Sequence, residues 1–423
     1  MKVLFVTLFP LENNTSVTIS NYGLLSGLKE LGHDITILMP QASNDESHIP
    51  YDVSSMRIIR IGGMPFDQLR KTPQKQTLWF KIKRKYHKWF DFLDFTKPYL
   101  KEAKQVSLLN EHFDLIISTS DPKTTHVFVR KLIKNGLSYG RWIQHWGDPM
   151  YGDITRSNSY PNWIVKLYER RIIKWADKIV YVSPFTADML KMAHPQYSSK
   201  INFVPLPCEE IVEPTSREKS PILKLVYLGD YSPNIRNILP LYDAVFGLSN
   251  VKLTIAGISS LKLDKTENIT ILPRIPQSQC HQLESEADVS ITVCNLRGTQ
   301  IPGKVYYAAS TQKHMLVILD GDEKEKLRKY INSYNRYIVC DNNVDSIKEA
   351  LLEELKLSNV EIINNYLVKD IKINKIEMEN GILNIDFSKE FNNITYNEFN
   401  EHILKDINLF DVPNDEYFKQ IDD

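Results

Sequence analysis

Short apolar runs alternate with amphipathic stretches along the first 200 residues. The apolar run at residues 3–8 is followed by residues 20–31, where apolar positions recur with a helical period up to Gly32, a residue type that commonly ends helices. Residues 33–40 form the next apolar run. This alternation predicts a parallel sheet covered by helices on both faces. Further strands are expected at residues 56–61, 115–118, 141–145, 178–182 and 201–204, and helices at 124–134 and 162–175.

The same alternation restarts in the second half of the chain. Between the halves, a polar stretch at residues 205–221 contains four prolines and predicts an interdomain linker. The sequence therefore predicts an α/β protein with two Rossmann-like lobes, at residues 1–205 and 218–355, and a ligand cleft between them. Strands of the second lobe are expected at residues 224–228, 252–256, 269–272, 289–293 and 315–319, with a helix at 238–246.

The pattern changes again from about residue 356. Residues 371–379 alternate between apolar and polar side chains, Asn380-Gly381 is typical of a type I′ turn, and residues 382–387 alternate once more. This order predicts a β-hairpin. Residues 356–423 are expected to form a C-terminal extension, and the sequence indicates no role for it.

Composition limits the function classes. The 423 residues are 42% hydrophobic and carry 52 basic and 52 acidic side chains, so the formal net charge is zero. A neutral chain is unlike proteins that bind nucleic acid by neutralising many phosphates. The turn after the first strand lacks Gly-x-Gly-x-x-Gly, which disfavours a nicotinamide or flavin enzyme.

Cysteine spacing and hydropathy bear on metals and membranes. The four cysteines show no Cys-x-x-Cys spacing, and no His-Glu-x-x-His sequence occurs, so a zinc site is not expected. No stretch reaches about 18 consecutive apolar residues, the length that a membrane span needs. We expect a cytoplasmic protein that contacts the inner face of the membrane peripherally, if at all.

Two short motifs favour a phosphate-bearing ligand. In Pro302-Gly303-Lys304, the lysine follows a turn at the expected start of a helix, where a cation and backbone N–H groups suit a phosphate. In the second motif, a buried run ends at Gly229 and a loop then delivers Arg236 and Asn237. An arginine fork and a lysine point charge together could clamp one diphosphate. A solvated loop arginine and an ordinary helix-start lysine are the alternatives.

The two motifs resemble the donor site of family-4-type (GT-B fold) glycosyltransferases. Gly229 and Arg236 match the family's Gly-x(6)-Arg loop, while Pro302, Lys304 and the residues that follow match its Pro-x-Lys-(Leu/Val)-(Phe/Tyr)-Glu-Tyr segment. Tyr307 stands where the family has a glutamate that commonly holds the donor ribose. The resemblance implies a GT-B fold and a nucleotide diphosphate sugar donor, with Gly303 and Tyr307 among the donor contacts.

A further glycine is a candidate for the donor side. Gly257 follows the run at residues 252–256, where the absence of a side chain would let a nucleotide approach the backbone closely. A plain turn glycine is the alternative.

Candidate acceptor residues lie in the first half. The stretch containing Asp121 and His126 resembles the family's Ser-x-Pro-Pro loop, and residues 141–150 resemble its Asp-Pro-Trp turn, with Met150 replacing the tryptophan. Polar groups at the carboxyl ends of parallel strands commonly bind ligands. Asp148 is expected to hydrogen-bond a sugar hydroxyl, with His145 beside it. The alternatives are a turn aspartate and structural histidines.

These observations lead to one leading hypothesis. The resemblance implies retaining transfer of a sugar, hexosyl or related, from a nucleotide diphosphate sugar to a glycan or lipid-linked acceptor, in cell-surface polysaccharide synthesis. Arg236 and Lys304 would stabilise the departing diphosphate and Asp148 would complete the catalytic set, so no cofactor or metal is required. The alternatives are a catalytically silent GT-B binding or partner subunit and a nucleotide-sugar epimerase of the same fold.

Residues 79–93 combine clustered cations with aromatic side chains at helical spacing. Such a segment suits an anionic membrane surface, with tryptophan at the interface. The alternative is a surface helix whose aromatic side chains pack on the first lobe. A nucleic-acid partner is not expected.

Overall fold

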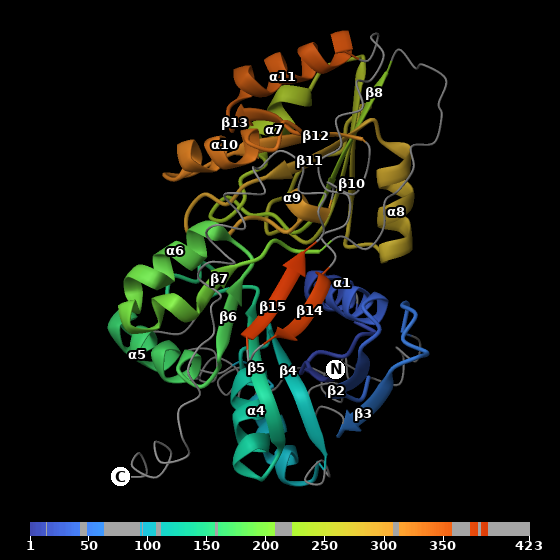
Figure 1. Ribbon diagram of the computed structural model, residues 1–423. Helices are drawn as coiled ribbons and strands as arrows, with labels where there is room; N and C mark the ends of the chain where they lie inside the picture. Colours follow the sequence, from blue (N-terminus) through green and yellow to red (C-terminus); the bar gives the residue numbers. More distant parts are fainter. Residues whose placement is uncertain are drawn as a thin grey trace, which may run out of the picture.

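Two parallel sheets, each covered by helices, form two lobes (Figure 1). The computed structural model describes residues 1–13, 15–42, 49–62, 94, 96–106, 111–156, 160–207, 222–307, 313–357, 373–379 and 382–387. Residues 79–93 and most of the linker at 205–221 therefore lie outside the described residues. The predicted architecture of two α/β lobes is confirmed.

The first lobe contains a seven-stranded sheet in the order β3-β2-β1-β4-β5-β6-β7, and every neighbouring pair is parallel. Its helices are α1 (Ser16–Glu30), α4 (Thr124–Lys134), α5 (Asn162–Ile173) and α6 (Pro184–Ala193), with two 3-10 segments, η1 (Lys97–Lys104) and η2 (Pro195–Lys200). The strands are β1 (Lys2–Val6), β2 (Asp34–Pro40), β3 (Arg57–Ile61), β4 (His112–Ser120), β5 (Ser138–Trp146), β6 (Lys178–Tyr181) and β7 (Ile201–Phe203).

Local sequence explains where α1 begins and ends. Thr15 is its N-cap, and the Thr15 and Thr18 side chains each accept a hydrogen bond from the other's backbone N–H, at 3.3 and 3.1 Å. This reciprocal pair satisfies two N–H groups that the helix itself cannot. The helix stops just before Gly32, whose φ of +72° suits glycine far better than other residues.

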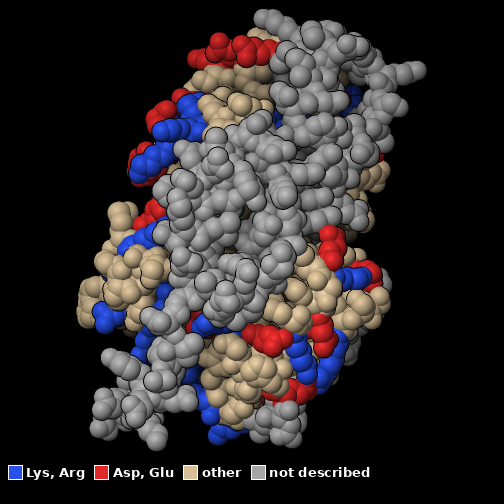
Figure 2. Space-filling view, viewed as in Figure 1, with Lys and Arg blue, Asp and Glu red and all other residues tan. Residues whose placement is uncertain are grey.

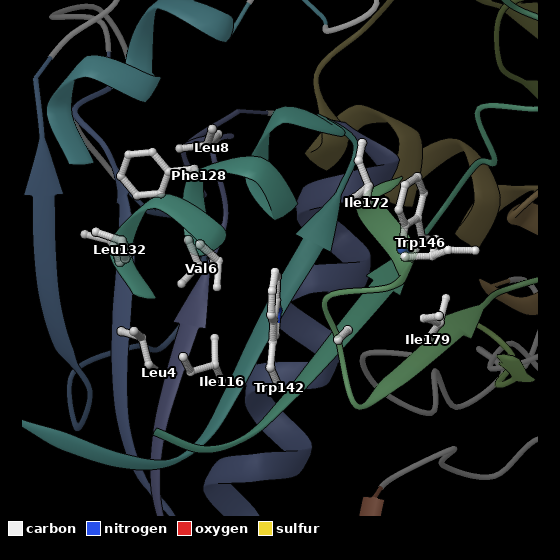
Figure 3. Close-up of a cluster of buried hydrophobic side chains, with 14 of the residues drawn as sticks. Leu4, Val6, Leu8, Ile116, Phe128, Leu132, Trp142, Trp146, Ile172 and Ile179 are labelled. Atoms are coloured by element: carbon white, nitrogen blue, oxygen red, sulfur yellow. The ribbon is translucent and has the colours of Figure 1, made fainter. Parts of the chain in front are cut away.

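Alternate residues of each strand feed two apolar layers, one on each face of the first sheet. Leu4 and Val6 of β1 point to the layer drawn in Figure 3, where they meet Phe128 and Leu132 of α4 and, further along the sheet, Trp142 of β5. Val3 and Phe5 point the other way, onto the apolar side of α1. A sheet buried on both faces explains why its strands read as nearly continuous apolar runs.

The second lobe contains a six-stranded parallel sheet in the order β10-β9-β8-β11-β12-β13. Its helices are α7 (Leu239–Val245), α8 (Gln277–Glu286), α9 (Lys304–Tyr307), α10 (Lys324–Asn332) and α11 (Val344–Leu357). The strands are β8 (Leu223–Leu228), β9 (Val251–Ala256), β10 (Ile269–Leu272), β11 (Val289–Val293), β12 (His314–Leu319) and β13 (Ile338–Asp341).

The C-terminal extension contains the predicted hairpin. Strand β14 (Ile373–Glu379) pairs antiparallel with β15 (Ile382–Phe387). The hairpin lies beside α1 of the first lobe (Figure 1). None of the described helices combines the length and the apolarity that a membrane crossing requires.

Candidate functional site at the contact between the lobes

Two glycine turns at the carboxyl ends of β8 and β9 pack backbone against backbone. Gly229 has a φ of +150°, and its N–H donates to the Ala256 carbonyl at 2.8 Å. A Cβ on Gly257 would lie only 2.0 Å from the Gly229 carbonyl oxygen. Any side chain at Gly257 would therefore displace the Gly229 turn, which gives this glycine a structural requirement independent of any ligand.

Lys304 lies against the same turn from another strand-to-loop crossing. Its Cε is 4.0 Å from the position that a Cβ on Gly229 would take, as is the Tyr227 hydroxyl oxygen. The Lys304 ammonium is 3.4 Å from the Glu284 carboxylate of α8, and 37% of the lysine side chain is exposed. The cation is thus accessible, and its ion pair with Glu284 is long.

Arg236 reaches this region from the loop after Gly229. Its Nε donates to the Asn295 side-chain oxygen at 2.9 Å. Among the described residues this is the one hydrogen bond of the guanidinium, which leaves its two amino groups for a ligand. Arg236 also acts electrostatically on buried Tyr227: burial raises the pKa of that phenol to about 12, and the guanidinium partly opposes the rise.

The other predicted donor residues have structural partners. The Asn237 side chain accepts from the Leu239 N–H at 3.2 Å, at the start of α7, and the Asn237 carbonyl accepts from Asn342 at 2.9 Å. A Cβ on Gly303 would lie 3.0 Å from a Leu206 methyl and 3.1 Å from the Tyr307 ring. Close packing therefore favours glycine at position 303, and donor contact by either residue stays a prediction.

Tyr307 joins the two lobes. Its hydroxyl donates to the carbonyl oxygen of Ser16, the first residue of α1, at 3.0 Å. This tyrosine of the second lobe thus contacts the first lobe. A glutamate here could not donate this bond, because an ionised carboxylate only accepts hydrogen bonds.

We expect Tyr307→Glu to impair nucleotide binding and any turnover more than Tyr307→Phe. The carboxylate would face the Ser16 carbonyl, so two acceptors would repel, whereas phenylalanine loses one hydrogen bond, worth about 0.5–1.5 kcal/mol, and keeps the ring against Gly303. Thermal unfolding and calorimetric titration with UDP and ADP measure the two effects. Equal behaviour of both variants and the wild type would show that this contact is unimportant.

On the first lobe, Lys123 is surrounded by carboxylates. Its ammonium lies 2.8 Å from Asp121 and 3.2 Å from Asp153. Burial disfavours the lysine charge, but Asp121, Asp153 and Asp148 outweigh it and raise the pKa of Lys123. Desolvation raises the pKa of Asp121 to about 6. The positive charge of Lys123 opposes this rise, and the negative charge of Asp148 adds to it. The group is a compact acidic patch around one fixed cation.

Gln300 connects Arg236 with Asp148. Its side-chain amide donates to the Asp148 carboxylate at 2.9 Å, and its backbone carbonyl accepts from the Asn295 side chain, also at 2.9 Å. Since Asn295 also accepts from Arg236, a continuous hydrogen-bonded chain runs from the arginine to the first lobe. Asn295 and Gln300 were not among the predicted site residues, although both lie in the loop that leads into Pro302-Gly303-Lys304.

The same loop docks on α6 of the first lobe. The Ser183 hydroxyl, at the N-cap of α6, donates to the Thr299 carbonyl at 2.6 Å, and Thr186 donates to it at 3.1 Å. A Cβ on Gly298 would lie 2.3 Å from a methyl of Ile154, so the backbone here approaches the opposite lobe closely. The lobes therefore meet in a closely packed, hydrogen-bonded interface near the Gln300–Asp148 contact.

The two predicted histidines are interior residues. His126 is fully buried, packs against Trp146 in a tilted arrangement with 4.4 Å between ring centroids, and shares a 2.8 Å hydrogen bond with Ser118. Burial lowers the pKa of His126 well below its usual value and that of His145 to about 4, so both are neutral at pH 7. Among the described residues, neither ring nitrogen of His145 has a hydrogen-bond partner.

A buried pair, Glu169 and His194, hydrogen-bonds to the backbone that follows Asp148. The Glu169 carboxylate accepts from the backbone N–H groups of Met150 and Tyr151, at 2.6 and 3.3 Å, and contacts His194 Nε2 at 3.1 Å. Both side chains are fully buried. Neither residue was predicted from the sequence. The signal for Glu169 was a glutamate among the apolar positions of an amphipathic helix, since glutamate is seldom buried without a partner.

The structure thus brings the predicted residues together in two groups. Gly229, Gly257 and Lys304 form one group in the second lobe, and Arg236 lies on the loop that follows Gly229. Asp121 and Asp148 form the other in the first lobe, joined to Arg236 through Asn295 and Gln300. Among the described residues, no three His, Cys, Asp or Glu side chains are grouped so that they could hold a metal ion.

Solved structures share this architecture at low sequence identity. Sucrose-phosphate synthase from Thermosynechococcus elongatus aligns over 84% of this chain and 90% of its own, with 12% identity and a TM-score of 0.54. The catalytic domain of starch synthase IV from Arabidopsis thaliana, bound to ADP and acarbose, aligns over 85% and 92%, with 10% identity and a TM-score of 0.56. A structure described as "Trehalose-6-phosphate from E. coli bound with UDP-2-fluoro glucose" aligns over 84% and 92%, with 11% identity and a TM-score of 0.54.

Sequence comparison adds nothing to this likeness. No protein-family model matches the chain, and no curated protein matches it significantly. The structural alignments cover both lobes of this chain and nine-tenths or more of each solved structure. The chain therefore has the two-lobed GT-B fold, as its sequence predicted.

Proposed function

We propose that the protein is a retaining glycosyltransferase of the family-4 type, which moves a sugar from a nucleotide diphosphate sugar to a glycan or lipid-linked acceptor. The observation that carries the proposal is the position of Arg236 and Lys304. They come from two separate strand-to-loop crossings: Lys304 lies against the Gly229 turn, and Arg236, on the loop that follows Gly229, is close enough to Tyr227 to act on its phenol. Both side chains carry hydrogen-bond donors for a diphosphate. Ligands of structures with the same fold, ADP and UDP-2-fluoro glucose, support a donor of this class.

In this reaction the two cations would stabilise the negative charge of the leaving group. As the bond between the anomeric carbon and the phosphate oxygen breaks, negative charge grows on the departing diphosphate, while the acceptor hydroxyl oxygen bonds to the carbon and its proton passes to the departing phosphate oxygen. Fixed cations that meet this charge stabilise the transition state more than the bound substrate. Asp148 would hold a sugar hydroxyl, and its bond to Gln300 would set its distance from Arg236.

The cellular role follows from the resemblance rather than from the geometry. We propose hexosyl or related transfer in cell-surface polysaccharide synthesis, by a cytoplasmic protein in peripheral contact with the membrane through residues 79–93. The Tyr307 contact with Ser16 also supports a second candidate, a catalytically silent binding subunit, because the family's ribose-binding glutamate is replaced by a link between lobes.

Turnover of a panel of nucleotide sugars tests the proposal. We expect release of a nucleoside diphosphate and a glycosylated product when a donor is supplied with lipid-linked or glycan acceptors, and loss of both in an Arg236→Ala, Lys304→Ala double variant. Calorimetry with the same donors separates the alternatives. Tight donor binding without product would favour the silent subunit, and conversion of the donor into an epimeric nucleotide sugar would favour the epimerase.

A further inference from the structure

Helix α5 exposes large apolar side chains on its outward face. Trp163 is 64% exposed and Leu167, one turn later, is 50% exposed. The opposite face is buried in the first lobe through Val165, Ile172 and Ile173. Residues four apart lie on the same side of a helix, so Trp163 and Leu167 form one apolar ridge.

Cations line both sides of this ridge. Lys166, Arg170, Arg171 and Lys174 follow Trp163 at helical spacing, and the last three are exposed. Among the described residues none of the four takes part in an ion pair, and the one acidic residue of α5, Glu169, is buried. The outward face therefore combines tryptophan, leucine and four cations. In Figure 2, tan and blue atoms cover this part of the molecule.

A neighbouring segment extends the apolar surface. Met192, near the end of α6, is 74% exposed. It lies two residues before His194, whose ring contacts Glu169 of α5 at 3.1 Å, so the end of α6 and the middle of α5 are close together. Figure 1 shows the two helices on the same side of the first lobe.

We propose that the outward face of α5 docks the protein on an anionic lipid bilayer. Trp163 and Leu167 enter the interfacial region, where an amphipathic ring and a short apolar side chain are stabilised, while the four cations meet lipid phosphates. Charge complementarity favours this occupant, because in the described part of the chain α5 has no exposed carboxylate, and the exposed Asp188 of α6 is paired with Lys191. The exposed tryptophan beside the cations favours a bilayer over a purely polyanionic partner.

This orientation would place the acceptor side of the site near the lipid. Glu169, on the buried face of the same helix, holds the N–H groups that directly follow Asp148-Pro149. A lipid-linked acceptor could then approach Asp148 from the bilayer. This last step rests on the proposed function, whereas docking itself does not.

Co-sedimentation of the full chain with vesicles measures the docking. We expect binding to vesicles of phosphatidylglycerol and phosphatidylcholine, little binding to phosphatidylcholine alone, and weakening by added salt. Arg170→Ala with Arg171→Ala should lower the partition coefficient about 25-fold, or about fivefold per cation, and Trp163→Ala with Leu167→Ala at least about tenfold. Residues 79–93 are unchanged in every variant, so these losses report α5 alone.

Matched controls come from the second lobe. Lys326→Ala with Lys329→Ala removes two exposed cations of α10, and Phe246→Ala removes a 59% exposed aromatic side chain. Both should bind vesicles like the wild type. Equal losses in these controls, or wild-type binding by both α5 variants, would refute the proposal.

Two further outcomes bear on the nature of the partner. Brominated lipid should quench the fluorescence of the wild type more than that of Trp163→Phe, because Trp163 enters the interface. If the arginine variant loses binding while Trp163→Ala with Leu167→Ala does not, and quenching is unchanged, the face binds polyanions without insertion and the bilayer assignment is wrong. Donor turnover is not needed for any of these measurements, so a failed glycosyltransferase assay leaves them interpretable.

Discussion

Replacing Arg236 or Lys304 by alanine should weaken the binding of a nucleoside diphosphate about 10- to 150-fold. Each change removes a charge-assisted contact worth about 1.5–3 kcal/mol, and 1.4 kcal/mol corresponds to a tenfold change in affinity. We expect Lys304→Ala at the lower end, since its ammonium is partly exposed and already faces Glu284. Calorimetric titration with UDP and with ADP gives the affinities.

Two companion variants sharpen this test. Glu284→Gln removes the carboxylate that competes with a phosphate for Lys304, so it should strengthen nucleotide binding. Lys326→Ala, on α10 of the same lobe, removes an exposed cation and should leave the affinity unchanged. Wild-type affinity in both Arg236→Ala and Lys304→Ala would mean that the diphosphate does not bind between them.

The strands were predictable because a strand that is buried on both faces is a nearly continuous apolar run in the sequence. Nearly every residue of β11 and β12 is buried, and both strands were expected within one residue of their observed ends. Helix α4 was predicted with the bounds that it has, because its apolar positions repeat with a helical period next to two well-marked strands. Local patterns of this kind need no knowledge of the partner segment.

Contacts between the lobes could not be predicted in this way. Gln300 and Asp148 are 152 residues apart in sequence, and neither position has a periodicity that points to the other. The contact of Tyr307 was equally hidden: the motif only drew attention to a tyrosine at this position, and only the fold shows that the phenol reaches Ser16. Such pairs depend on how two finished lobes pack, which no short pattern encodes.

Buried polar residues were only partly predictable from the sequence. His126 and His145 were identified as candidates by type, and the structure shows that burial keeps both neutral inside the first lobe. Glu169 was overlooked, although a glutamate between Val165 and Ile172 is unusual on an apolar helix face. A rule that inspects charged residues on apolar faces would have found it.

Removing the Glu169 carboxylate should cost more stability than any surface substitution in the chain. Glu169→Ala leaves the N–H groups of Met150 and Tyr151 and the ring of His194 without their acceptor, in a site that water cannot reach. Breaking a buried pair of this kind typically costs about 3–5 kcal/mol. Denaturant and thermal unfolding measure the loss. Glu325→Ala, which breaks the exposed 3.3 Å pair with Arg328, should change stability by less than about 1 kcal/mol.

The amide variant separates a structural role from positioning of Asp148. In Glu169→Gln the side-chain oxygen can still accept from Met150 and Tyr151, and the amide group can still hydrogen-bond to the His194 ring, so most of the stability should return. If the Asp148 turn serves the acceptor, Glu169→Ala should raise the KM for the acceptor or lower kcat. The affinity for a nucleoside diphosphate, which binds in the other lobe, should change by no more than a factor of about two, because substitutions at distant sites act nearly independently. Glu169→Gln should restore both kinetic parameters. A folded Glu169→Ala protein with wild-type acceptor kinetics would show that the turn need not be held for transfer, and Asp148 would then lose its proposed place in the site.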